Sequence, residues 1–172
     1  MINEPGYRLN VGLIIINDKG KLLLCKRKNI DSWQFPQGAI DNNETYLQAA
    51  KRELFEEVGI RSSCIKLLSS TEDWLKYDIP KKRRKNHFLK KKFKGQKQKW
   101  FMFKLIEDAH IHFDNDPDNE FIDYKWVPYW YPLYTIIDFK KDVYRSVLME
   151  FRMKFSKAVS YTHLTLPTIL LV

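Results

Sequence analysis

Apolar and polar residues follow patterns typical of β-strands over much of the chain. Residues 9–16 are apolar and rich in β-branched side chains, and a second apolar run follows the turn sequence Asn17-Asp18-Lys19-Gly20. Two such runs joined by a short turn predict a β-hairpin. Apolar and aromatic residues also alternate with a period of two over residues 99–106, which predicts a strand. Extended segments are expected over residues 9–16, 21–27, 33–38, 64–80, 99–106, 110–113 and 121–129.

Two helices are expected where apolar residues recur with a period near 3.6. In the first helix, four apolar residues lie on one face: Leu47, Ala50, Leu54 and Val58. We expect Asn42 or Asn43 to cap its N-terminus and Gly59 to end it in a left-handed conformation. A long closing helix is expected over residues 133–155, with apolar positions suited to packing on a sheet: Ile136, Ile137, Val143, Val147, Leu148 and Phe151.

The order strand–helix–strands–helix predicts the α/β class, with helices on both sides of a mixed β-sheet. The 172 residues, 44% of them hydrophobic, are expected to form one domain with a sizeable core. We place this domain at residues 1–155, including a loop insertion over residues 81–99 that holds eleven basic and no acidic residues. Residues 160–172 differ in composition from the rest of the chain, and residues 156–172 are expected to form a tail outside the domain, for which a non-native origin is one explanation. We expect residues 166–172 not to be buried in the core.

The formal net charge of +9 at pH 7 favours polyanionic partners such as nucleic acid or nucleotides. No apolar stretch reaches the ~18 residues needed to span a bilayer, and the first residues do not resemble a signal peptide. Cys25 and Cys64 lie in apolar runs without metal-ligand spacing, so buried, reduced thiols are expected. These features predict a cytoplasmic protein without a membrane partner.

Three acidic residues of the first helix suggest a metal site. Glu53, Glu56 and Glu57 stand at i, i+3 and i+4, so their carboxylates converge on one side of the helix. Their mutual repulsion would be relieved by a cation, and Mg²⁺ is commonly shared between carboxylates and substrate phosphates. The simpler interpretation is a solvated acidic face that Lys51 and Arg52 partly neutralise.

The surrounding spacing resembles the signature of the Nudix hydrolases. Gly38 is followed after five residues by Glu44, and after seven more by Arg-Glu-Leu-Phe-Glu-Glu-Val-Gly-Ile, with every fixed position present. One branch of the family is further resembled by four other segments: residues 6–12, 33–38, 95–101 and 139–144. Members of that branch convert 5′-triphosphorylated or diphosphorylated RNA ends to monophosphates, which opens the transcript to decay.

The resemblance implies a Nudix fold, hydrolysis of phosphoanhydride bonds, and two or more Mg²⁺ ions or another divalent cation such as Mn²⁺. The implied metal ligands are the Gly38 carbonyl and the carboxylates of Glu53, Glu56, Glu57 and Glu120. The four glutamates are also the implied catalytic residues, with Glu120 completing the metal site or acting as general base. Asp116, Asp118 and Asp123 lie near Glu120 in sequence and are alternatives to it.

Other residues receive supporting roles from the same resemblance. Glu44 and Arg52 would orient the carboxylates. Contacts with phosphates or the first nucleotides of RNA are implied for Arg8, Arg27, Gln37, Phe139 and Lys140. For Phe139, packing in the core is the alternative interpretation.

Two other functions use the same features. A dinucleoside (diadenosine) polyphosphate hydrolase would need the same metal site. A catalytically silent domain that only binds RNA or a nucleotide is disfavoured, because the three helix carboxylates are all present. The basic loop is interpreted both as a solvated loop and as a surface that attracts RNA 5′ ends, and these are compatible. The sequence identifies no stimulating protein partner.

Overall fold

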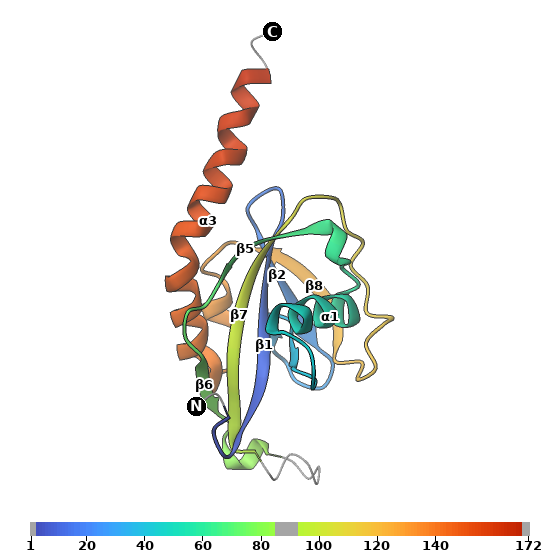
Figure 1. Ribbon diagram of the computed structural model, residues 1–172, viewed down its shortest axis with the longest axis vertical. Helices are drawn as coiled ribbons and strands as arrows, with labels where there is room; N and C mark the ends of the chain where they lie inside the picture. Colours follow the sequence, from blue (N-terminus) through green and yellow to red (C-terminus); the bar gives the residue numbers. More distant parts are fainter. Residues whose placement is uncertain (1–2, 85–92, 170–172) are drawn as a thin grey trace.

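The computed structural model describes residues 3–84 and 93–169, with residues 161–169 described by their backbone alone. A mixed β-sheet lies between helix α1 (Tyr46–Val58) on one side and helix α3 (Lys141–Ile169) on the other (Figure 1). This arrangement confirms the expected α/β sandwich. No helix in the described part of the chain is both long and apolar enough to cross a membrane.

The sheet is mixed because its two longest strands run parallel while the other pairs are antiparallel. Strand β1 pairs with β7 along its whole length, and β4 pairs antiparallel with β1 beside it. The strand order is β3-β2-β1-β7-β5, with β6 on β7 and β8 on β2. The strands are β1 (Tyr7–Ile16), β2 (Leu22–Arg27), β3 (Trp33–Gln34), β4 (Gln37–Ala39), β5 (Ile65–Ser70), β6 (Leu75–Asp78), β7 (Gly95–Leu105) and β8 (Phe121–Val127). The short helices are η1 (Ser62–Cys64), η2 (Lys81–Arg83), α2 (Pro132–Thr135) and η4 (Asp138–Lys140).

The core has two layers, one on each face of the sheet. Successive side chains of a strand point to opposite faces, so Trp100 and Met102 of β7 pack with α3 while Phe101 and Phe103 pack with α1. The predicted alternation over this strand is therefore confirmed. Both cysteines are free thiols, as expected. Cys25 is buried in the α1 layer, whereas Cys64 is only half-buried, so the expected burial is confirmed for Cys25 alone.

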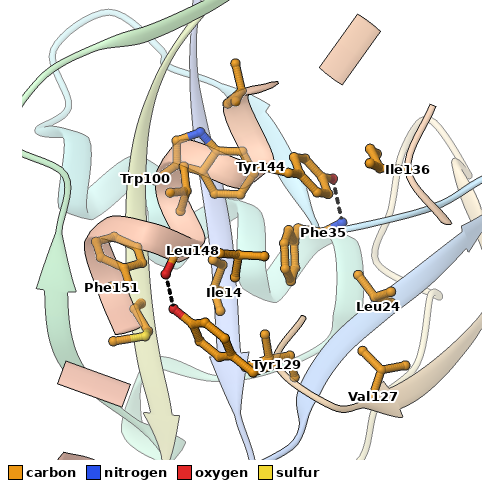
Figure 2. Packing of buried hydrophobic residues seen from close by; sticks show 14 of the residues in the cluster. Ile14, Leu24, Phe35, Trp100, Val127, Tyr129, Ile136, Tyr144, Leu148 and Phe151 are labelled. Atoms are coloured by element: carbon orange, nitrogen blue, oxygen red, sulfur yellow. Dashed lines mark hydrogen bonds between the residues drawn. The ribbon is translucent and has the colours of Figure 1, made fainter. Parts of the chain in front are cut away.

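The layer beneath α3 fixes the segment that leads into β4. The Tyr144 hydroxyl accepts a hydrogen bond from the Phe35 backbone N–H at 2.9 Å, and the Phe35 ring packs against Tyr144 and Trp100 (Figure 2). In the same layer, the Tyr129 hydroxyl donates to the Leu148 carbonyl of α3 at 2.6 Å. Because Phe35 is held in this way, the position of the following strand β4 relative to the sheet is fixed.

Two predicted strands differ from the structure. The strand expected over residues 64–80 is divided into β5 and β6, because Thr71 leaves the ladder and binds Trp100 through both its backbone N–H and its hydroxyl. The prediction of a strand over residues 110–113 is wrong. That segment crosses the end of α1, where the His112 backbone N–H donates to the Val58 carbonyl instead of to a strand.

The helix boundaries also differ from expectation. The N-cap of α1 is Thr45, in a capping box with Gln48, whereas Asn43 takes a positive φ of 70° in the preceding turn. The closing helix is interrupted, because Ile136 and Ile137 are extended between α2 and η4. The predicted C-cap at Gly59 is confirmed, with φ of 74°.

Helix α3 continues past residue 155 to Ile169, and Val159 lies against Gly20 in the turn between β1 and β2. The side chains of residues 166–172, whose packing the sequence analysis addressed, lie outside the described part of the structure. The proposed boundary between domain and tail stays a prediction.

Candidate active site

Helix α1 presents two carboxylates at the edge of the core. The capping box at Thr45 and the left-handed Gly59 fix both ends of the helix, and its apolar face packs in the α1 layer. In this orientation Glu53 and Glu57 are only 9% and 5% exposed. Charged carboxylates this deeply buried are costly unless they are paired with cations or hydrogen-bond donors.

Gly38 of β4 makes room for the Glu53 carboxylate. A Cβ atom built on Gly38 would lie 1.9 Å from Cδ of Glu53, far inside an ordinary contact. The absence of a side chain at residue 38 therefore allows the carboxylate to lie directly against the strand backbone. This contact brings together the signature glycine and the first of the three helix glutamates.

The Glu57 carboxylate lies beside the same strand. Its Oε2 accepts a hydrogen bond from the Gln37 backbone N–H at 2.9 Å. Burial raises the pKa of Glu57 well above its usual value, and the nearby charges of Glu120 and Glu53 raise it further. Burial likewise raises the pKa of Glu53. Arg52 opposes this effect at Glu53, whereas no cation of the described residues is among the groups that offset the raised pKa of Glu57.

Glu120, in the loop before β8, lies near enough to Glu57 for its charge to affect the pKa of Glu57. Its backbone N–H donates to Asp116 Oδ2 at 2.7 Å, and its carbonyl accepts from the Lys28 N–H at 2.8 Å. Among the acidic residues of the loop, Glu120 has a larger effect on the pKa of Glu57 than Asp116 has. Its assignment as ligand or base remains a prediction supported by this proximity.

Arg52 connects the loop after β4 to the carboxylates of α1. Its guanidinium donates to Glu44 at 2.6 Å, to Glu53 at 2.8 Å, to Glu56 at 3.1 Å and to the Ala39 carbonyl at 2.8 Å. These hydrogen bonds, first of all the one with Glu44, raise the pKa of Arg52, and the pKa of Glu44 is correspondingly lowered. Arg52 therefore connects Glu44 to Glu53 and Glu56, and the role of Arg52 and Glu44 in orienting the carboxylates stays a prediction.

The donor set fits a hard divalent cation. Carboxylate and carbonyl oxygens are the ligands that such cations prefer, and the buried Glu53 and Glu57 lie against the Gly38 backbone with excess negative charge. As the side chains are placed, no three Asp, Glu, His or Cys residues within the described chain are close enough to hold a metal ion. Arg52 supplies positive charge to Glu53 and Glu56 in this arrangement.

A cluster of buried amides lies on the other side of Gln37, and the sequence analysis did not predict it. Gln98 is fully buried, and its Nε2 donates to Asn10 Oδ1 at 2.8 Å and to Gln37 Oε1 at 3.1 Å. Gln37 in turn donates to Gln96 Oε1 at 3.2 Å. The available signal was that Gln96 and Gln98 share the face of β7 that carries the buried Trp100.

Lys140 is buried in this cluster. Its ammonium lies 3.3 Å from Gln34 Oε1 and 3.5 Å from Gln37 Oε1. Burial lowers the pKa of Lys140 to about 7, and the Arg27 charge adds to the effect while Glu120 and Glu57 oppose it. Lys140, Arg27, Gln37 and Glu120 are therefore brought together around one site, although they come from four separate segments.

The remaining predicted residues lie around the same cluster. Phe139 packs against the ring of Tyr77 at a centroid distance of 5.7 Å and belongs to the rim of the α3 layer, in agreement with its core-packing interpretation. Arg8 is exposed and pairs in register with Gln96. Arg8 thus lies at the solvent-exposed side of the amide cluster, next to Gln96.

Comparison with known families identifies the class of protein to which this α/β sandwich, with its acidic helix against Gly38, belongs. The NUDIX domain family model matches residues 6–147. The chain therefore belongs to the Nudix hydrolase family, whose members act on pyrophosphate bonds.

Two relatives indicate the branch of the family. The chain is 46% identical over 152 residues to an RNA pyrophosphohydrolase of Shigella boydii serotype 4, covering 88% of this chain and 86% of the relative. It is 44% identical over 168 residues to an RNA pyrophosphohydrolase of Shewanella baltica, covering 97% and 94% of the two chains.

Solved structures support the fold. The dihydroneopterin triphosphate pyrophosphohydrolase of E. coli superposes with a TM-score of 0.65 at 21% identity, covering 84% of this chain and 98% of that one. An Ap4A hydrolase of C. elegans gives 0.62 at 19% identity, covering 89% and 98%. At these identities the likeness concerns the fold alone.

Proposed function

We propose that this protein is an RNA 5′-pyrophosphohydrolase that converts 5′-triphosphorylated or diphosphorylated RNA to 5′-monophosphorylated RNA and so triggers mRNA decay. The observation that carries the proposal is the continuous site from Glu53 and Glu57, through Gln37, to Lys140 and Arg27. Carboxylates for cations lie at one end of it, and cations for phosphates lie at the other. The relatives named above support the choice of RNA.

Each residue has a distinct role in this proposal. Two or more Mg²⁺ ions, or ions of another divalent metal, would be held by five groups: the Gly38 carbonyl and the carboxylates of Glu53, Glu56, Glu57 and Glu120. When bound, such ions lower the pKa of water and stabilise negative charge on a phosphoryl group. Arg52 would hold Glu53 and Glu56 in position, and Glu120 would accept a proton from the attacking water.

The substrate would be oriented by the cationic end of the site. Lys140 and Arg27 attract phosphate oxygens, and Gln37 offers an amide that is already fixed by Gln98. Arg8, which is exposed beside Gln96, would contact the RNA where it leaves the site. Phe139, half-buried beside Tyr77, would stack with one of the first bases, as aromatic rings do with single-stranded RNA.

A competition experiment tests the proposal. Purified protein with Mg²⁺ is given 5′-labelled triphosphorylated RNA, diphosphorylated RNA and diadenosine tetraphosphate in one reaction. We expect monophosphorylated RNA as the labelled product, formed in preference to cleavage of the dinucleotide. Preferred cleavage of the dinucleotide would instead assign the site to dinucleoside polyphosphates. Glu53→Gln serves as the inactive control.

A further inference from the structure

One end of the sheet is strongly basic, close to where β1, β6 and β7 meet (Figure 1). We call this surface the basic rim. The residues that define it are Lys76, Lys81, Lys82, Arg83, Lys94 and Lys97. Two acidic residues lie among them, Glu4 and Asp78. The rim therefore keeps a clear excess of positive charge.

Three lysines of the rim, Lys76, Lys94 and Lys97, are positioned by neighbouring groups. The ammonium groups of Lys76 and Lys94 lie 5.0 and 4.9 Å from the centroid of the Tyr7 ring. Glu4 adds a 2.9 Å ion pair with Lys76 and a 3.6 Å ion pair with Lys97. Cations held in this way lose less side-chain entropy on binding a ligand than free lysines do.

Backbone hydrogen bonds connect the rim into one surface. The Lys94 N–H donates to the Gly6 carbonyl, and the Ile79 N–H donates to the Lys94 carbonyl. The Arg84 side chain caps the Ile79 carbonyl at the end of η2. The basic residues of β6, η2 and β7 are thus parts of the same end of the sheet.

The rim begins beside the active site. Gln96 accepts a hydrogen bond from Gln37 and pairs with Arg8 in the β1–β7 register. Lys97 of the rim follows Gln96 directly along β7, with its side chain on the opposite face of the sheet. Gly12 of β1 pairs with Gln37, and Tyr7 of the rim region stands five residues before Gly12 along β1. At 3.3 to 3.4 Å per residue, Tyr7 is about 17 Å from Gly12. A stacked strand advances about 3.4 Å per phosphate, so the rim would meet phosphates roughly five nucleotides from the reacting end.

We propose that the basic rim binds the phosphate backbone of the RNA downstream of its 5′ end. The proposal rests on the proposed function and extends it, since it separates recognition of the RNA body from recognition of the terminal phosphates. A substrate shorter than the distance to the rim gains nothing from these lysines. A long RNA gains affinity that salt weakens.

The test uses the full-length protein with Lys76→Gln, Lys82→Gln and Lys94→Gln combined. The matched control combines Lys19→Gln, Lys66→Gln and Lys154→Gln, which removes the same charge from exposed positions outside the rim. Hydrolysis of triphosphorylated RNA of twenty nucleotides is compared with hydrolysis of a triphosphorylated dinucleotide, from low to high salt. Wild-type turnover of the dinucleotide reports the proposed function separately.

For the rim variant we expect a KM for long RNA about tenfold higher at low salt, with kcat unchanged and with the dinucleotide unaffected. The slope of log affinity against log salt should fall by about 2, because each phosphate contact of a single strand contributes about 0.7. The control variant should resemble wild type. If both variants behave alike on long RNA, or if the rim variant loses the same factor on both substrates, the rim does not bind the RNA body. Equal behaviour of the two variants on long RNA is also the result expected if the rim binds an acidic protein instead of RNA.

Discussion

The substitution Gly38→Ala isolates the contact on which the carboxylate site depends. Gly38 is not among the positive-φ glycines, so alanine fits the backbone there. The added Cβ, however, would lie 1.9 Å from Cδ and 2.1 Å from Oε2 of Glu53. Because the atoms that it meets are the carboxylate itself, the functional group is what must move.

The size of the effect follows from that distance. An ordinary Cβ contact begins near 3.4 Å, so the carboxylate must shift by about 1.5 Å. Displacing a reactive geometry by about 1 Å can cost on the order of 100-fold in rate, so we expect kcat/KM to fall at least about 100-fold. The free energy of unfolding should change by less than about 1 kcal/mol, since Gly→Ala at a compatible position restricts the unfolded chain.

A double-mutant cycle provides the assay. Rates of pyrophosphate release and thermal unfolding are measured for Gly38→Ala, Glu53→Ala and the double variant. If Gly38 acts through Glu53, the double variant should be no less active than Glu53→Ala alone. Near wild-type turnover by Gly38→Ala, or a further loss in the double variant, would refute the reasoning.

Three other substitutions test separate parts of the site. Glu57→Gln should reduce kcat at least about 100-fold. Its thermal stability without metal should equal or exceed that of wild type, because burial and the charges of Glu120 and Glu53 raise the pKa of Glu57. A clear loss of stability in calorimetry would contradict this. Arg52→Lys should lower kcat/KM about 10- to 100-fold, since one ammonium cannot reproduce the hydrogen bonds to Glu44, Glu53 and Glu56; unchanged titration with Mg²⁺ would count against that role. Lys140→Met should be more stable than wild type below pH 7, where the buried ammonium is charged. The difference in stability should shrink as pH rises from about 7, the pKa of Lys140 in the folded protein, toward 10.5, its pKa in the unfolded chain. The same variant should bind triphosphorylated RNA more weakly, and a stability gain that does not depend on pH would show that Lys140 is not the titrating group.

The sequence predicted the elements whose determinants are local. The periodicity of α1 and the alternation over Trp100 to Phe103 both describe residues that are close along the chain, and the structure confirms both. The N-cap was misplaced because two asparagines, which are also good capping residues, precede Thr45. Which of the three residues caps the helix depends on the backbone conformation, including the positive φ of Asn43. The interruption of the closing helix at Ile136 and Ile137 had no signal in their side chains, which are apolar in either conformation.

The amide cluster could not be predicted because it depends on the long-range register of the sheet. Gln98 meets Asn10 only through the parallel pairing of β1 and β7, and it meets Gln37 only because β4 pairs with β1. The position of Lys140 depends on the break before η4, which turns it toward Gln34. Family resemblance, not periodicity, had indicated Gln37 and Lys140 in advance.

Anomalous diffraction from crystals soaked with Mn²⁺ and a non-hydrolysable triphosphorylated RNA tests the central claim most directly. The account predicts manganese peaks within bonding distance of Glu53 and Glu57 carboxylate oxygens, with the terminal phosphates between those peaks and Lys140. Manganese bound elsewhere, or phosphates docked away from α1 with Arg52 still holding Glu53, would contradict it.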